Sequence, residues 1–100
     1  MKILKVSTKN PQDLKIAIND KIENKEITSW QIDETGKSLS HKGPQYIDHF
    51  YFEYYIDKPK GILEFQFNSS STSSFADSRA FQLLERMLKS HFANEIEIIK

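Results

Sequence analysis

Cysteine is absent from this chain of 100 residues, and so are long apolar runs. The lack of cysteine excludes disulfides, thiolate zinc sites and thiol nucleophiles. No apolar run approaches the roughly 18 residues that a membrane-spanning helix needs, so we expect no association with a membrane. Residues 1–6 carry a charge every few residues and contain no apolar stretch of signal-peptide length. A cytoplasmic location is therefore the expectation.

Glycine is scarce, and the chain has no net charge. The three glycines, Gly36, Gly43 and Gly61, each stand beside a turn signal, which argues against a phosphate-binding loop or a dinucleotide fingerprint. We therefore expect no cofactor. Fourteen basic side chains balance fourteen acidic ones, so no long-range field attracts nucleic acid or acidic membranes. Any partner must be recognised by a local surface.

The chain does contain enough large apolar side chains to bury one core, which predicts a single α+β domain over residues 1–100. Period-two and period-3.6 patterns predict the elements. The first helix, 11–25, has Asn10 as its cap and Pro11 in its first turn, with Asn19 among the side chains that face water. The second helix runs from a capping box at Ser74 and Asp77 to about Ala93. Strands are predicted over 3–8, 27–33, 38–41, 46–57, 62–67 and 95–100.

The segment 46–67 predicts a long hairpin whose turn is Lys58-Pro59-Lys60-Gly61. This register sorts the side chains onto two faces, because neighbouring residues of a strand point to opposite sides. The core face would carry Phe50, Phe52, Tyr54, Ile56, Leu63, Phe65 and Phe67. A second, shorter hairpin is predicted to pair Ile32 with Leu39 and Trp30 with His41. The serine-rich run 68–74 is predicted to be a surface loop.

Together these elements predict two helices on one face of a mainly antiparallel sheet, in the order β-α-β-(β)-β-β-α-β. If the short strand 38–41 is an excursion, the remainder resembles the ferredoxin-like β-α-β-β-α-β plan in element order. This architecture hosts enzymes, binding modules and regulators alike, so the resemblance implies no function.

No catalytic or metal-binding constellation is predicted. His41, His49 and His91 lie on three separate elements, without the spacing that places two metal ligands together. Asp48 and His49 are neighbours on a strand and point to opposite faces, which disfavours a direct contact. The serine run has no motif of a nucleophilic serine. We therefore expect no metal site and no catalytic residue.

The outer face of the long hairpin is the candidate binding surface. Tyrosine offers a large contact area at low entropic cost, and the acidic side chains beside it would set specificity. Nucleic acid is not expected there, because the carboxylates would repel phosphates. The alternative is that the tyrosines merely cover the sheet. The predicted partner-binding residues are Tyr51, Glu53, Tyr55, Glu64 and Gln66.

Three functions follow from these observations. The leading hypothesis is a non-enzymatic protein-binding module, such as a small bacterial inhibitor or immunity-type protein. The second is a small enzyme or binder that acts on nucleic acid or phosphate esters through His49 or His91, which a shared cleft would favour. The third is a self-associating domain that pairs its aromatic sheet face, or its weak strand 38–41, with a second copy.

Overall fold

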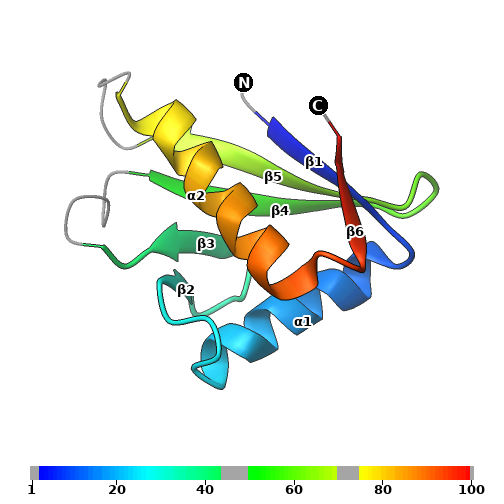
Figure 1. Ribbon diagram of the computed structural model, residues 1–100, viewed down its shortest axis with the longest axis horizontal. Helices are drawn as coiled ribbons and strands as arrows, with labels where there is room; N and C mark the ends of the chain where they lie inside the picture. Colours follow the sequence, from blue (N-terminus) through cyan, green and yellow to red (C-terminus); the bar gives the residue numbers. More distant parts are fainter. Residues whose placement is uncertain (1–2, 44–49, 70–74, 100) are drawn as a thin grey trace.

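The computed structural model describes residues 3–43, 50–69 and 75–99, with the backbone alone for 69 and 75–77. These residues form six strands in one antiparallel sheet and two helices (Figure 1). The α+β class is confirmed. The helices are α1 (Pro11–Glu23) and α2 (Phe75–Phe92). The strands are β1 (Ile3–Thr8), β2 (Trp30–Ile32), β3 (Ser38–His41), β4 (Phe50–Asp57), β5 (Ile62–Ser69) and β6 (Ile96–Ile99).

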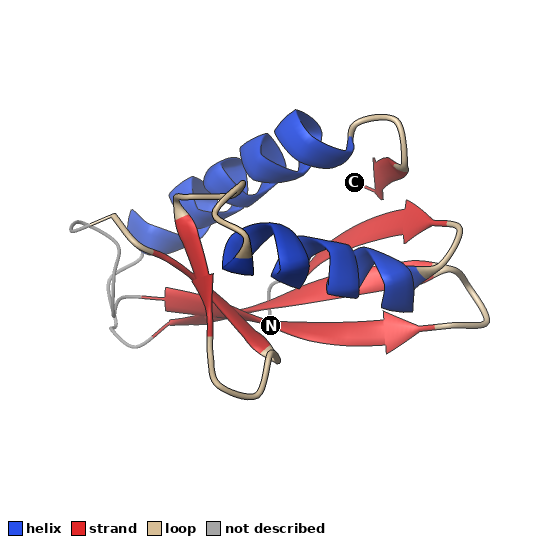
Figure 2. Ribbon diagram, turned by 90° about the horizontal axis from the view of Figure 1, so that it is seen from below, coloured by secondary structure: helices blue, strands red, loops and turns tan. Residues whose placement is uncertain are grey.

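The sheet has the strand order β2-β3-β4-β5-β1-β6, and both helices lie against the same face of it (Figure 2). Strands β4, β5, β1 and β6 form one half, in which α2 connects β5 to β6 across β1. Helix α1 leads from β1 to β2, at the far edge of the sheet. Strands β2 and β3 extend the sheet beyond β4. The exact ferredoxin-like order is not confirmed, because β2 and β3 both pair within the sheet, which therefore has six strands where that plan has four.

Both predicted hairpin registers are confirmed. In the long hairpin Phe52 pairs with Phe67 and Tyr54 with Phe65, and in the short hairpin Trp30 pairs with His41. Gly61 closes the long turn with φ +64, and a Cβ there would lie 2.9 Å from the carbonyl oxygen of Thr8. This turn therefore requires glycine for both its backbone conformation and the close approach of β1.

Helix α1 begins and ends with well-formed caps. Asn10 Oδ1 accepts hydrogen bonds from the backbone N–H groups of Gln12 and Asp13, at 3.1 and 3.2 Å. At the other end Lys25 has φ 64, and the N–H of Glu26 donates to the carbonyl of Lys21 over 2.8 Å. This is a Schellman cap, which ends the helix at Glu23, two residues before its predicted end. The strand predicted over 27–33 is shorter as well and covers only Trp30–Ile32.

The core lies between the helices and the inner face of the sheet. Leu14, Ile18 and Ile22 form the buried stripe of α1. Helix α2 contributes a stripe of five buried side chains, Ala80, Leu84, Met87, Leu88 and Phe92. The aromatic side chains of the sheet meet them there, and Trp30, Phe52 and Phe65 are at most 1% exposed. Alternating strand residues and 3.6-residue helix periodicity thus supply one continuous core.

Asn19 differs from its prediction. Instead of facing water it is half-buried, and its Oδ1 accepts a hydrogen bond from the Tyr54 hydroxyl over 3.1 Å. Its Nδ2 donates to the carbonyl of Gly36 over 3.2 Å. Burial raises the pKa of Tyr54 well above its ordinary range, so this hydroxyl stays a neutral donor. One amide side chain therefore connects α1 to β4 and to the β2–β3 turn.

Several predicted features lie outside the described residues. These are the strand segment 46–49 with Asp48 and His49, the serine run from 70 onward, and the capping box of Ser74 with Asp77. Among the residues that the structure does describe, neither helix has the length and apolar character needed to cross a membrane.

Candidate functional site: the open sheet face

The helices leave the opposite face of the sheet uncovered (Figure 2), and this face is here called the open sheet face. It carries every second side chain of its strands. Strand β4 places Tyr51, Glu53 and Tyr55 there because Phe50, Phe52 and Tyr54 point into the core. In the half formed by β4, β5, β1 and β6, this face carries Tyr51, Glu53, Tyr55 and Asp57; Ile62, Glu64, Gln66 and Asn68; Ile3, Lys5 and Ser7; and Glu97 and Ile99.

The strand registers arrange these side chains in rows. One row crosses four strands and contains Tyr55, Glu64, Lys5 and Ile99. The next row contains Glu53, Gln66 and Ile3. Ile3 is thus a diagonal neighbour of Ile99, close enough for apolar contact. The face has tyrosines on β4, exposed isoleucines on β1 and β6, and mainly polar side chains on β5 between them.

Of the five predicted partner-binding residues, three are exposed. Tyr51 is 38% exposed and Tyr55 is 55% exposed. They stand four residues apart on β4, about 14 Å at roughly 3.4 Å per residue, with Glu53 between them. Glu53 is exposed, and its Oε1 accepts a hydrogen bond from Asn68 Nδ2 over 3.1 Å. This bond orients the carboxylate that separates the tyrosines.

The other two predicted residues, Glu64 and Gln66, are less accessible. The side chain of Glu64 is 15% exposed, and its Oε1 lies 3.8 Å from Nζ of Lys5, whose side chain is 48% exposed. Gln66 is half-buried at the centre of the face. All five predicted residues lie on one surface, but Glu64 already has a basic partner within the chain, so Glu53 is the more available carboxylate.

Sequence reasoning missed Ile3, Lys5 and Ile99. Ile3 on β1 and Ile99 on β6 are 39% and 41% exposed. Both continue this face because β1 pairs with β5 on one side and with β6 on the other. The apolar residues among lysines in 3–8 predicted a strand, without indicating which side chains face solvent. Nothing local indicated that Ile3 and Ile99 lie on the face that carries Tyr51 and Tyr55.

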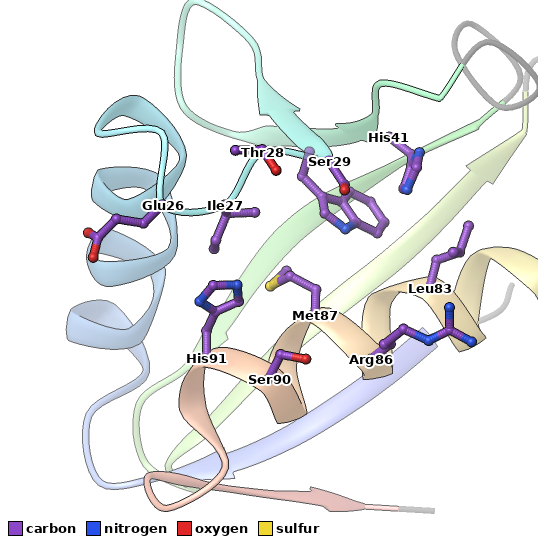
Figure 3. A pocket seen from close by; sticks show the side chains of 11 residues that line it. Glu26, Ile27, Thr28, Ser29, His41, Leu83, Arg86, Met87, Ser90 and His91 are labelled. Atoms are coloured by element: carbon purple, nitrogen blue, oxygen red, sulfur yellow. The ribbon is translucent and has the colours of Figure 1, made fainter.

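A second feature is an open pocket on the helix side of the sheet, here called the tryptophan pocket (Figure 3). Its cavity volume is about 320 Å³, and its lining includes Ile27, Trp30, His41, Arg86, Met87 and His91. His41 from β3 and His91 from α2, fifty residues apart in the chain, therefore share one cavity. His41 and His91 lie on separate elements, as predicted, although both line this cavity, while His49 lies outside the described residues.

The neutral ring of His41 can donate a hydrogen bond through Nε2. Its Nδ1 accepts the backbone N–H of Gly43 over 2.9 Å, so the proton of the neutral ring is on Nε2. Partial burial, and then the positive charge of Arg79, lower the pKa of His41 below its ordinary value of 6.5. The ring also packs edge-on against Trp30, with centroids 5.1 Å apart. A neutral Nε2–H ring cannot accept a proton at Nε2 without changing tautomer, which disfavours His41 as a general base.

The part of the chain that the structure describes contains no group of three or more His, Cys, Asp or Glu side chains arranged to hold a metal ion. Comparisons of the chain with protein-family models, with curated proteins and with solved structures found no match. The open sheet face and the tryptophan pocket are therefore the features from which a function can be inferred.

Proposed function

We propose that this protein is a non-enzymatic protein-binding module whose contact surface is the open sheet face. The observation that carries the proposal is the distribution of exposed large hydrophobic side chains. Among the described residues there are five, and four of them, Ile3, Tyr51, Tyr55 and Ile99, lie on this face. Single exposed apolar residues are normal on a surface, but their concentration on one uncovered face is typical of an interaction site.

Charge supports a partner with a basic surface. The described strand residues of this face include four carboxylates, on Glu53, Asp57, Glu64 and Glu97, and one ammonium group, on Lys5. A surface of opposite sign would be steered toward the face and held in register by these groups. The lysines at the hairpin turn, Lys58 and Lys60, lie beyond the end of β4.

The same charges argue against a symmetric homodimer through this face. In a two-fold dimer the same patch occurs on both copies, so the carboxylates of one copy would approach those of the other. Like charges placed opposite each other oppose association. We therefore favour a different protein as the partner over a second copy of this chain. Inhibitor and immunity-type proteins are narrower members of this class, and their partner would be an enzyme that loses activity in the complex.

The proposal is tested with the double variant Tyr51→Ala/Tyr55→Ala. The wild-type chain is immobilised to capture its partner from a lysate of its source cells, and the purified partner is then titrated by calorimetry against each variant. If the tyrosines are anchors of the interface, their loss should weaken binding at least about thirtyfold, because interface hot spots are worth about 2 kcal/mol or more. Inhibition of the partner's own activity by the wild-type chain would identify the inhibitor class.

Ile16→Ala is the matched control. Ile16 is 46% exposed but belongs to α1, on the other side of the sheet, so its loss should leave affinity unchanged. Glu53→Lys, compared with Glu23→Lys on α1, tests the sign of the partner's charge. Equal affinity of wild type and the double tyrosine variant would contradict the proposal. Sedimentation velocity over a range of concentrations separates self-association from binding to another protein.

A further inference from the structure

The tryptophan pocket lies between α2 and the segment that leads into β2. Helix α2 forms one wall with Arg86, Met87 and His91, and Ile27 and His41 approach from the other side (Figure 3). Trp30 also lines the pocket. The cavity volume of about 320 Å³ is at the small end of the range for ligand sites. This pocket is separate from the open sheet face, so it can be tested independently of the proposed function.

The floor of the pocket is apolar and contains one buried donor. Ile27, Trp30 and Met87 are 2%, 1% and 6% exposed. Among the described residues, the indole N–H of Trp30 makes no hydrogen bond. Every side-chain nitrogen or oxygen of these residues that is fully enclosed does have a hydrogen-bond partner, so the indole nitrogen is not fully enclosed. The indole N–H must therefore contact solvent, and the pocket is the opening that Trp30 lines. A solvated donor at the floor of the pocket suits a ligand that carries a hydrogen-bond acceptor.

The rim of the pocket is positive. Among the described residues that line it, Arg86 carries the permanent positive charge, and no ion pair of the described residues involves Arg86. Glu26 also belongs to the lining, but its Oε1 lies 4.0 Å from Nζ of Lys21, and its carboxylate points away from the pocket, toward α1 (Figure 3). Ser90, one turn after Arg86 on α2, adds a hydroxyl.

We infer that the tryptophan pocket binds a small organic carboxylate. The carboxylate of the ligand is held by the guanidinium of Arg86, which matches a carboxylate with two parallel hydrogen bonds. The rest of the ligand occupies the opening above Trp30, beside the half-buried side chain of Leu83. One permanent positive charge balances the single negative charge of a carboxylate, whereas a phosphate dianion would retain excess charge. The size of the cavity fits a ligand of one aromatic ring with a short acidic side chain.

The experiment uses the one tryptophan of the chain as its reporter. Phenylacetate is titrated into the full-length protein while the indole N–H resonance of Trp30 is followed by ¹⁵N–¹H correlation spectroscopy, with tryptophan fluorescence as a second readout. Phenylacetamide, which has the same shape without the charge, and inorganic phosphate are titrated in parallel. A saturable shift with phenylacetate, about tenfold weaker with phenylacetamide, is expected from a charge-assisted contact.

Arg86→Gln should weaken phenylacetate binding about tenfold as well, since it removes the charge and keeps a polar side chain of similar length. Lys89→Gln removes a positive charge from an exposed position of the same helix outside this pocket and should leave the affinity unchanged. The inference is overturned by the lack of a saturable shift, by equal binding of acid and amide, or by an unchanged affinity in Arg86→Gln. Tighter binding of phosphate than of phenylacetate also overturns it. The comparison of acid and amide uses the unaltered protein and needs no variant to fold.

Discussion

Replacement of Phe52 by alanine measures whether β4 faces the core as described. Phe52 is fully buried, and its ring lies near four other aromatic rings. The ring centroids of Phe81 and Phe67 are 5.4 and 5.7 Å away, and those of Phe50 and Trp30 are 5.9 and 6.1 Å away. Phe52→Ala removes this contact to both hairpins and to α2 in a single step.

The expected cost is large relative to the stability of a domain of this size. A buried Phe→Ala substitution costs about 3–5 kcal/mol, from lost burial and from the cavity that remains. Because aromatic partners surround this ring, about 4 kcal/mol is the central expectation. At about 4–8 °C per kcal/mol, the midpoint of thermal unfolding should fall by about 16–32 °C. Such a loss is a considerable part of the roughly 5–15 kcal/mol that stabilises a typical domain.

The assay is urea unfolding of wild type and variant, followed by far-ultraviolet circular dichroism and by Trp30 fluorescence. Coincident transitions by the two probes would justify a two-state free energy. Tyr51→Ala is the control, because Tyr51 precedes Phe52 on the same strand and points to the open sheet face. It should cost about 1 kcal/mol or less, the size of a cross-strand contact. Equal losses in the two variants, or a loss below about 2 kcal/mol for Phe52→Ala, would refute the assignment of the strand faces.

Two further predictions concern local backbone structure. Lys25→Gly should stabilise the protein by about 1 kcal/mol in urea unfolding, because Lys25 adopts φ 64, where a Cβ is unfavourable; a loss of stability would show that the lysine side chain matters more than this strain. The carboxylate of Asp33 caps the β2–β3 turn. Slight burial acts to raise its pKa, but hydrogen bonds from Ser38 N–H, the Thr35 hydroxyl and Lys37 N–H outweigh burial and hold the pKa below the ordinary 3.8. The stabilisation by this carboxylate is present above pH 3.8 and is lost as pH falls through the lower folded pKa. The difference in unfolding free energy between wild type and Asp33→Ala should therefore shrink at more acidic pH. A difference that stays constant with pH would contradict this prediction.

Much of the fold could be predicted because its signals are local. The turn at Lys58–Gly61 and strict alternation on both sides determine which residue of β4 faces which residue of β5. The end of α1 could not be placed, because a lysine occupies the left-handed position that glycine usually marks. Asn19 was assigned to water because its contact with Tyr54 joins residues 35 positions apart.

The candidate sites show the same division between local and long-range information. The alternation in β4 and β5 was sufficient to place Tyr51, Glu53 and Tyr55 on one surface. The contribution of Ile3 and Ile99 depends on β1 lying between β5 and β6, which no local pattern encodes. The tryptophan pocket was missed for the same reason, because its lining combines the end of one helix, the edge of a hairpin and α2.

The most direct test of the account is a hydroxyl-radical footprint of the protein with and without its captured partner. The claim that the open sheet face is the contact surface predicts that Tyr51 and Tyr55 are strongly protected in the complex. Ile16, which is 46% exposed on α1, should react equally in both states. Protection of Ile16 while both tyrosines stay reactive would place the partner on the helix side of the molecule and contradict the central claim.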